Sequence, residues 1–168
     1  MTDWEAILRE DGPAVWRAAR RIVGNDADAD ECYQEAFLAA LEYSRKKQVL
    51  RWRPLLVRIA TARAIDRIRR RIRCNNRQEQ PNWNDIQSGA PIPPDRIEQI
   101  ELAERLRQVL LQLYQQQAEV FCLACLDGWS HRQIADELAM TVGSVGVTVH
   151  RARRKLSGLL GSITEVWR

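Results

Sequence analysis

The residues best suited to binding a polyanion lie near the end of the chain. From Thr141 to Leu156, apolar residues recur at steps of three or four and predict a helix. Its other face begins with small residues and ends with cations: Thr141, Gly143, Ser144, Val147, His150, Arg151, Arg153, Arg154 and Lys155. A slim start and a basic end fit the DNA major groove with phosphates alongside. We predict that this face binds duplex DNA, the alternative being an ordinary solvated charged face.

A pair of short helices is predicted to present this surface. Gly128 suits the end of a preceding helix, because glycine adopts the left-handed cap conformation without strain. Ser130 and Gln133 form an S-x-x-Q capping box, and Thr141 is an N-cap candidate for the next helix. Ala135 is small where the two helices would cross. The spacing therefore predicts a helix-turn-helix.

A second group of cations lies in residues 51–80, which hold ten basic and two acidic residues. Apolar residues at helical spacing predict one long amphipathic helix over residues 51–73. The cations that recur at i, i+4, i+7 and i+8 are Arg63, Arg67, Arg70 and Arg71. This stripe could bind phosphates, or it could be a solvated face. Trp52 could pack in the core or stack on an unstacked base, and one indole ring can do both.

Three aspartates open the acidic segment that starts at residue 26. Asp26, Asp28 and Asp30 invite comparison with a calcium loop, but that loop needs Gly at its sixth position and Glu at its twelfth. The chain has Glu31 and Phe37 there, so we predict no metal site. The simpler interpretation is a helix whose acidic first turn stabilises its N-terminus. Leu38 lies among carboxylates on the exposed face of this helix. That face is either solvated or a docking surface for a basic partner.

Composition predicts two all-α domains in this chain of 168 residues and net charge +4. Residues 74–97 hold four of the six prolines and no helical period, so they are predicted to be a linker between domains at 1–73 and 98–168. Within the first domain, helical spacing covers residues 4–23 with an interruption at Gly12-Pro13.

Cysteine usage and hydropathy predict a cytoplasmic protein without a cofactor. No run is apolar enough to cross a membrane, so membrane insertion is not expected. Cys122 and Cys125 are spaced C-x-x-C, as in metal and redox sites, but they lie in an apolar helical run. We interpret them as buried thiols.

Three segments, in order, resemble the extracytoplasmic-function (ECF) group of bacterial sigma-70-family RNA polymerase sigma factors. Residues 28–41 are similar to the group's DAEDLVQETFLRAW-like helix. Residues 52–71 are similar to its W-L-x-x-I-A-x-N-x-x-x-D-x-x-R-R segment. Residues 128–156 are similar to its G-x-S-Y-x-E-I-A-x-x-L signature and the R-A-R-x-x-L that follows. The resemblance covers nearly the whole chain and implies sigma regions 2 and 4.

The resemblance also implies a role for each segment. The helix over residues 30–43 would dock on the clamp helices of the polymerase's largest subunit through Glu31, Gln34, Glu35 and Leu38. The 51–71 segment would recognise and melt the promoter −10 element through Trp52, Arg58, Thr61, Ala62, Arg63, Arg67, Arg70 and Arg71. The helix-turn-helix would read the −35 element and contact the polymerase flap. An anti-sigma factor is an expected further partner.

Two departures from the group's pattern bear on base readout. The group often has Asn for base capture where this chain has Ala62, so Thr61 or Arg63 would have to substitute, or specificity is looser. Gly146 and Thr148 stand where the group is often basic. Base readout would then depend on Ser144, Val147, His150 and Arg151, or on DNA shape.

Two other functions are compatible with parts of the sequence. A stand-alone helix-turn-helix regulator would bind duplex DNA as a dimer, but it leaves the arginine-rich helix without a role. A metal-dependent nucleic-acid enzyme would use Asp28 and Asp30, whose spacing fits poorly. We predict no enzymatic activity.

Overall fold

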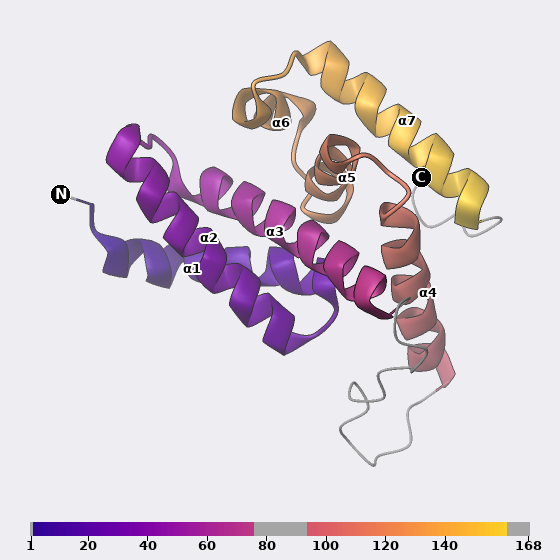
Figure 1. The fold of residues 1–168 in the computed structure, drawn as a ribbon. Helices are drawn as coiled ribbons and strands as arrows, with labels where there is room; N and C mark the ends of the chain where they lie inside the picture. Colours follow the sequence, from indigo (N-terminus) through magenta and orange to yellow (C-terminus); the bar gives the residue numbers. More distant parts are fainter. Residues whose placement is uncertain (1, 76–93, 161–168) are drawn as a thin grey trace.

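The computed structural model describes residues 2–75 and 94–160, and within these ranges every regular element is a helix (Figure 1). Their bounds are α1 Trp4–Val23, α2 Asp26–Lys46, α3 Trp52–Asn75, α4 Pro94–Leu110, α5 Gln115–Phe121, the π-helical turn η2 Cys122–Leu126, α6 His131–Leu138 and α7 Val142–Leu160. The predicted all-α class is confirmed.

Helices α1, α2 and α3 pack along one another as one unit (Figure 1). Asp3 caps α1 by accepting a hydrogen bond from the Ala6 amide at 3.0 Å. Gly24 ends α1 in the left-handed conformation, and Asn25 caps α2 by accepting from the Asp28 amide at 2.8 Å. The core of this unit is built from small and branched residues: Val15, Ala18, Ala19, Ile22, Ala29, Cys32, Ala36, Ala40, Leu56, Ala60, Ala64, Ile65 and Ile68.

Helix α1 is continuous through Pro13, so the predicted interruption at Gly12-Pro13 is wrong. Ile7 before this point and Val15 after it are both buried, and their packing keeps the two halves in one helix despite the missing Pro13 amide. Gly12 serves the packing instead. A β-carbon there would lie 2.9 Å from the Tyr33 hydroxyl, so glycine allows α2 to approach closely.

The second unit is made of α4, α5, η2, α6 and α7, in which α7 packs on the other helices. Its core consists of Leu110, Leu113, Val120, Phe121, Cys122, Leu123, Ile134, Val145, Val149, Ala152 and Leu156. The helix predicted up to Gly128 changes to π-helical geometry at Cys122 and ends with the Asp127 amide bonded to the Cys122 carbonyl at 3.1 Å. Gly128 then takes φ +69°, as expected of a glycine at a helix end.

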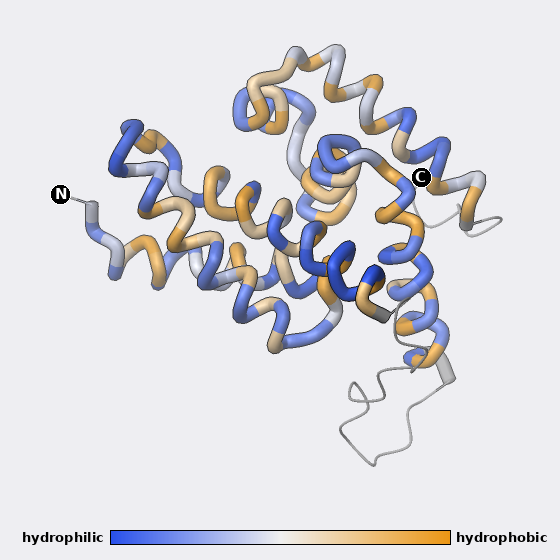
Figure 2. The backbone as a smooth tube through the Cα atoms, in the orientation of Figure 1, coloured by the Kyte–Doolittle hydropathy of each residue, from blue (hydrophilic) through white to orange (hydrophobic). Residues whose placement is uncertain are grey.

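Helix occupies both ends of the predicted 74–97 linker, because α3 continues to Asn75 and α4 begins at Pro94. The remaining linker residues, 76–93, lie outside the described ranges. Among the described residues, no helix is both long enough and apolar enough to span a bilayer. In the hydropathy view, the C-terminal half of α3 is strongly hydrophilic, as its arginines require (Figure 2).

The two units touch chiefly through α3, which packs against α5, η2 and α6, and α1 adds polar contacts. Arginine side chains donate these polar contacts. They are Arg69 Nη2 to the Leu113 carbonyl at 2.8 Å, Arg107 Nε to the Ile22 carbonyl at 2.8 Å, Arg58 Nε to Glu137 Oε1 at 3.2 Å, and Arg21 Nη1 to Asp127 Oδ1 at 3.3 Å and to the Leu126 carbonyl. Buried apolar residues of both units also belong to one cluster, so the interface combines apolar packing with polar contacts from arginines.

Candidate nucleic-acid interface

Helices α6 and α7 form the predicted helix-turn-helix, and local side chains set its start and turn. Ser130 Oγ accepts from the Gln133 amide at 3.2 Å, and Gln133 Oε1 accepts from the Ser130 amide at 2.9 Å, so the capping box is present. Ala139 closes α6 at φ 53°, an unusual conformation for a residue with a β-carbon. The turn is three residues long and directs α7 across α6.

Thr141 caps α7, as predicted. Its hydroxyl oxygen accepts from the Ser144 amide at 3.1 Å and donates to Ser144 Oγ at 2.8 Å. Thr148 Oγ1 donates back to the Ser144 carbonyl at 2.8 Å. The polar groups at the start of α7 are thus held by one another, and their orientation is fixed before any ligand arrives.

All nine residues predicted to contact duplex DNA are exposed on α7 or its cap. The opposite stripe, made of Val145, Val149, Ala152 and Leu156, is buried against α5 and α6. Val147 is 49% exposed, so an apolar side chain also lies on this outer face. The structure therefore brings the predicted residues together on one accessible face.

The basic end of this face divides into two kinds of side chain. Arg153 Nη2 lies 3.4 Å from Cys125 Sγ, and Lys155 Nζ bonds the Gln112 carbonyl, so both are drawn back onto the second unit. Arg151 and Arg154 make no hydrogen bond or ion pair with any residue that the structure describes, and both are exposed. They are the cations most available to phosphates or base edges.

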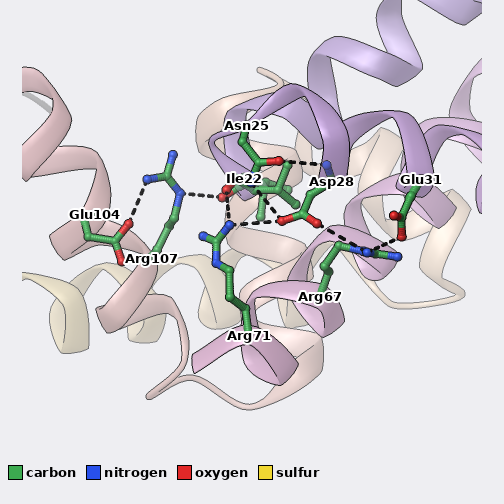
Figure 3. A network of polar contacts seen from close by, with 9 residues as sticks. Ile22, Asn25, Asp28, Glu31, Arg67, Arg71, Glu104 and Arg107 are labelled. Atoms are coloured by element: carbon green, nitrogen blue, oxygen red, sulfur yellow. Dashed lines mark hydrogen bonds and ion pairs between the residues drawn. The ribbon is translucent and has the colours of Figure 1, made fainter. Parts of the chain in front are cut away.

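The arginines predicted as a phosphate track on α3 lie in different surroundings. Arg67 is held by three carboxylates of α2. Its Nη1 lies 3.4 Å from Asp28 Oδ1 and contacts Glu31 (Figure 3). Its Nη2 lies 3.1 Å from Glu35 Oε1. Arg71 Nη1 donates to Asp28 Oδ2 and to the Val23 carbonyl, both at 3.1 Å.

The remaining two arginines of the track are more open. Arg63 approaches Glu35 at 3.9 Å with its side chain 42% exposed. Arg70 is exposed and makes no ion pair or hydrogen bond within the described ranges. The four predicted cations therefore do not form one free stripe.

The other residues implied for the −10 element are half-buried or buried. Trp52 packs edge-on against Trp4 with ring centroids 4.8 Å apart, which favours its core role without hiding the ring fully. Arg58 pairs with Glu137 of α6, and Ala62 is partly exposed. Thr61 is fully buried, and its hydroxyl has no hydrogen-bond partner in the part of the chain that the structure describes. In this arrangement Thr61 does not reach the surface.

The residues implied for polymerase docking share the outer face of α2. Gln34 is exposed, Leu38 is 63% exposed, and the side chains of Glu31 and Glu35 are 59% and 37% exposed. A shallow hollow of about 320 Å³ beside them is lined by Glu35, Leu38, Ala39, Glu42, Arg63 and Arg70. An exposed leucine ringed by carboxylates is a suitable contact for a partner with apolar and basic groups.

Cys122 is buried as the sequence predicts, whereas Cys125 is only partly buried, so that part of the prediction is wrong. Cys122 is fully buried, and burial raises the pKa of its thiol well above the ordinary range. Burial likewise raises the pKa of Cys32 to about 11, although Arg67 opposes the shift. Both are therefore neutral thiols at physiological pH. Among the described residues, no group of three or more His, Cys, Asp or Glu could hold a metal ion.

Several residues that organise the surface escaped the sequence-based prediction. From the sequence, Asp28 is predicted only to stabilise the N-terminus of its helix. In the structure it also bridges Arg67 and Arg71. Its spacing of three and seven residues from Glu31 and Glu35 places all three on one helix face, which was the available signal. Asp127 and Glu137 join the two units, and no local pattern indicates that. Burial raises the pKa of Asp127, with Arg21 opposing the shift.

Comparison with known proteins matches both halves of the chain. Residues 7–74 match the model of sigma-70 region 2, and residues 103–156 match that of sigma-70 region 4. The ferric citrate uptake sigma factor FecI of Escherichia coli is 30% identical over 129 residues, 74% of this chain and 72% of FecI. The ECF sigma factor SigW of Bacillus subtilis is 27% identical over 84% of this chain and 80% of SigW.

A further relative and two solved structures agree with these matches. The ECF sigma factor SigE of Mycolicibacterium smegmatis is 26% identical over 95% of this chain, which spans only 62% of that relative's length. Sigma factor RpoE of Bartonella quintana, solved with the anti-sigma factor NepR, has a TM-score of 0.58 at 20% identity and covers 97% of this chain and 99% of its own. CnrH, solved with the cytosolic domain of CnrY, has a TM-score of 0.60 at 24% identity. The match covers 95% of this chain and 88% of CnrH. These structures share the fold.

Proposed function

This chain belongs to the ECF group of the sigma-70 family of RNA polymerase sigma factors, and we propose that it is a promoter-specificity subunit. In this role it binds core RNA polymerase, recognises the −35 and −10 elements and promotes DNA melting. The observation that best supports the proposal is the accessible face of α7. There a pre-formed cap, an exposed valine and two unpaired arginines lie along one helix of a helix-turn-helix.

The two units have different roles in this proposal. The unit from residues 1–73 docks on the clamp helices of the largest polymerase subunit through Glu31, Gln34, Glu35 and Leu38. It also recognises the −10 element and promotes its melting. The unit from residues 98–168 reads the −35 element and contacts the polymerase flap. Residues between them serve as the linker.

The protein carries out no covalent step in this proposal. Contacts with the non-template strand offset the cost of unstacking a few base pairs, and the polymerase supplies the rest. The protein acts in the cytoplasm. An anti-sigma factor is a further proposed partner, since the sigma factor RpoE, which has the same fold, was solved with the anti-sigma factor NepR.

Run-off transcription tests the proposal directly. Core polymerase is mixed with the full chain and a library of promoter fragments, and transcripts are sequenced. We expect initiation from a subset of promoters that share an upstream and a −10 element. Absence of initiation from every fragment, together with tight duplex binding by the protein without polymerase, would instead indicate a stand-alone regulator.

A further inference from the structure

The acidic face of α2 is organised by one guanidinium group of α3. Asp28, Glu31 and Glu35 lie on the same side of α2, and each contacts Arg67. The Arg67 side chain is 20% exposed, whereas that of Glu31 is 59% exposed. Glu31 and Glu35 thus lie closer to solvent than the arginine, whereas Asp28, at 21% exposed, is about as buried as Arg67.

Electrostatics explains why this position needs a cation. Glu31 and Glu35 are four residues apart on one helix, a spacing at which like charges repel. Burial by itself would lower the pKa of Arg67, but the hydrogen bond and charge of Glu31 raise it, and the charge of Asp28 adds to the increase. The guanidinium is therefore permanently charged, and it holds both glutamates in a fixed orientation.

The same contacts make Arg67 a poor ligand for DNA. A phosphate could reach it only after displacing carboxylates that already satisfy its donors, and the displaced carboxylates would repel the phosphate. Arg70 on the same helix is exposed and has no such partners among the described residues. The two arginines are three residues apart, yet only one of them is available to a nucleic acid.

We infer that Arg67 is a positioning residue for the polymerase-docking face and acts through Glu31 and Glu35 instead of through DNA. The inference rests on the proposed function. The Asp28 side chain extends the same arrangement, because it joins Arg67 to Arg71 and is itself fixed by Asn25 at 2.9 Å (Figure 3). The docking carboxylates are thereby anchored to α3 and to the end of α1, where Arg71 bonds the Val23 carbonyl.

The test compares R67A with R73A in the full chain, since Arg73 is an exposed arginine of the same helix and belongs to neither proposed surface. Two quantities are measured: the Kd for core polymerase, and transcription from a double-stranded promoter template at saturating polymerase. We expect R67A to raise the Kd about tenfold and to recover wild-type transcription once polymerase is saturating. R73A should change the Kd less than about twofold. A normal Kd for R67A, with defective transcription at saturation, would overturn the inference in favour of a DNA role.

A double-mutant cycle separates positioning from general loss of structure. If Arg67 acts through Glu31 and Glu35, R67A adds little to the loss caused by E31Q/E35Q, so the triple variant binds polymerase about as E31Q/E35Q does. Independent, multiplying losses would overturn the inference. Should R67A fail to fold, R67K keeps the charge without the forked geometry, and an intermediate Kd is expected. Wild-type protein that fails to bind polymerase at all would instead refute the proposed function.

Discussion

Arginines on this surface have two distinct physical roles, and residue type alone does not separate them. Arg67, Arg71 and Arg107 donate to carboxylates or to carbonyl groups at the end of α1. Arg151 and Arg154 have no partner within the described ranges and face solvent. A guanidinium that is already paired must give up those bonds before it can bind phosphate, so only the second kind is poised for DNA.

Arg151→Ala should weaken binding to the upstream promoter element. An arginine contact with a base edge or a nearby phosphate contributes about 1–3 kcal/mol, so the Kd of the polymerase complex for an upstream duplex should rise at least fivefold. Fluorescence anisotropy measures this. Arg153→Ala is the matched control, because that side chain is turned towards Cys125. An equal loss in both variants would contradict the division of the basic face.

Gly146→Ala should stabilise the second unit. Gly146 lies inside α7, where glycine costs roughly 1 kcal/mol relative to alanine. An added β-carbon would lie 3.6 Å from His131 Nδ1, an ordinary contact distance. The free energy of unfolding, measured by urea denaturation, should therefore rise by about 0.5–1 kcal/mol. A loss of stability would mean that α6 and α7 pack more tightly at this point than the structure indicates.

At the scale of elements, helix ends determine where the units meet. The end of α1 offers the Ile22 and Val23 carbonyls, which intrahelical bonds leave free, and arginines from α4 and α3 bond them. Gly24 permits this approach because it has no side chain and takes φ +84°. One short segment thus serves as helix cap, turn and docking point.

Gly24→Ala should destabilise the protein more than Gly128→Ala does. Both glycines have positive φ, so each substitution carries the left-handed strain of about 1 kcal/mol. At Gly24 the β-carbon would also lie 2.2 Å from Arg107 Nη2 and displace the guanidinium, whereas nothing lies within 4 Å at Gly128. Thermal unfolding of the two variants checks this. Equal decreases in Tm for the two variants would show that the Arg107 contact contributes nothing to stability.

Local spacing predicted those elements whose causes are local. The capping box at Ser130, the cap at Thr141 and the buried stripe of α7 depend on residues three or four apart, and all three were confirmed. The continuity of α1 through Pro13 and the π-helical turn at Cys122 depend on packing against other helices. A single-sequence pattern holds no information about those neighbours.

The candidate site follows the same rule. Exposure of the α7 face was predictable because one helix and its apolar stripe decide it. The pairing of Arg67 with Asp28 and Glu35 joins residues more than thirty positions apart, and it requires the register between α2 and α3. The burial of Thr61 likewise reflects how α3 is rotated against its partners.

For the whole molecule, the contact between the two units combines apolar packing with polar groups that are incompletely satisfied. Arg69 Nε and Asp127 Oδ2 are buried side-chain atoms without a hydrogen-bond partner among the described residues. Such atoms cost free energy, and relative motion is the usual expectation for two domains of one chain unless their interface is large and apolar. The contact also pairs Arg58, predicted to serve the −10 element, with Glu137 of α6. Release of Arg58 therefore requires α3 and α6 to move apart or their pair to break.

Glu137→Gln should loosen the contact between the units in the free protein. The Glu137 carboxylate, whose side chain is 15% exposed, pairs with Arg58 at 3.2 Å, and the amide keeps an acceptor but removes the charge. We expect a larger radius of gyration by small-angle X-ray scattering. The wild-type radius should also increase with salt, because ion pairs weaken as screening rises. Asp136→Asn, at the exposed neighbouring position, should leave the radius unchanged. If Glu137→Gln matches the wild type at every salt concentration, the arginine bonds to the Leu113 and Ile22 carbonyls hold the units together without this pair.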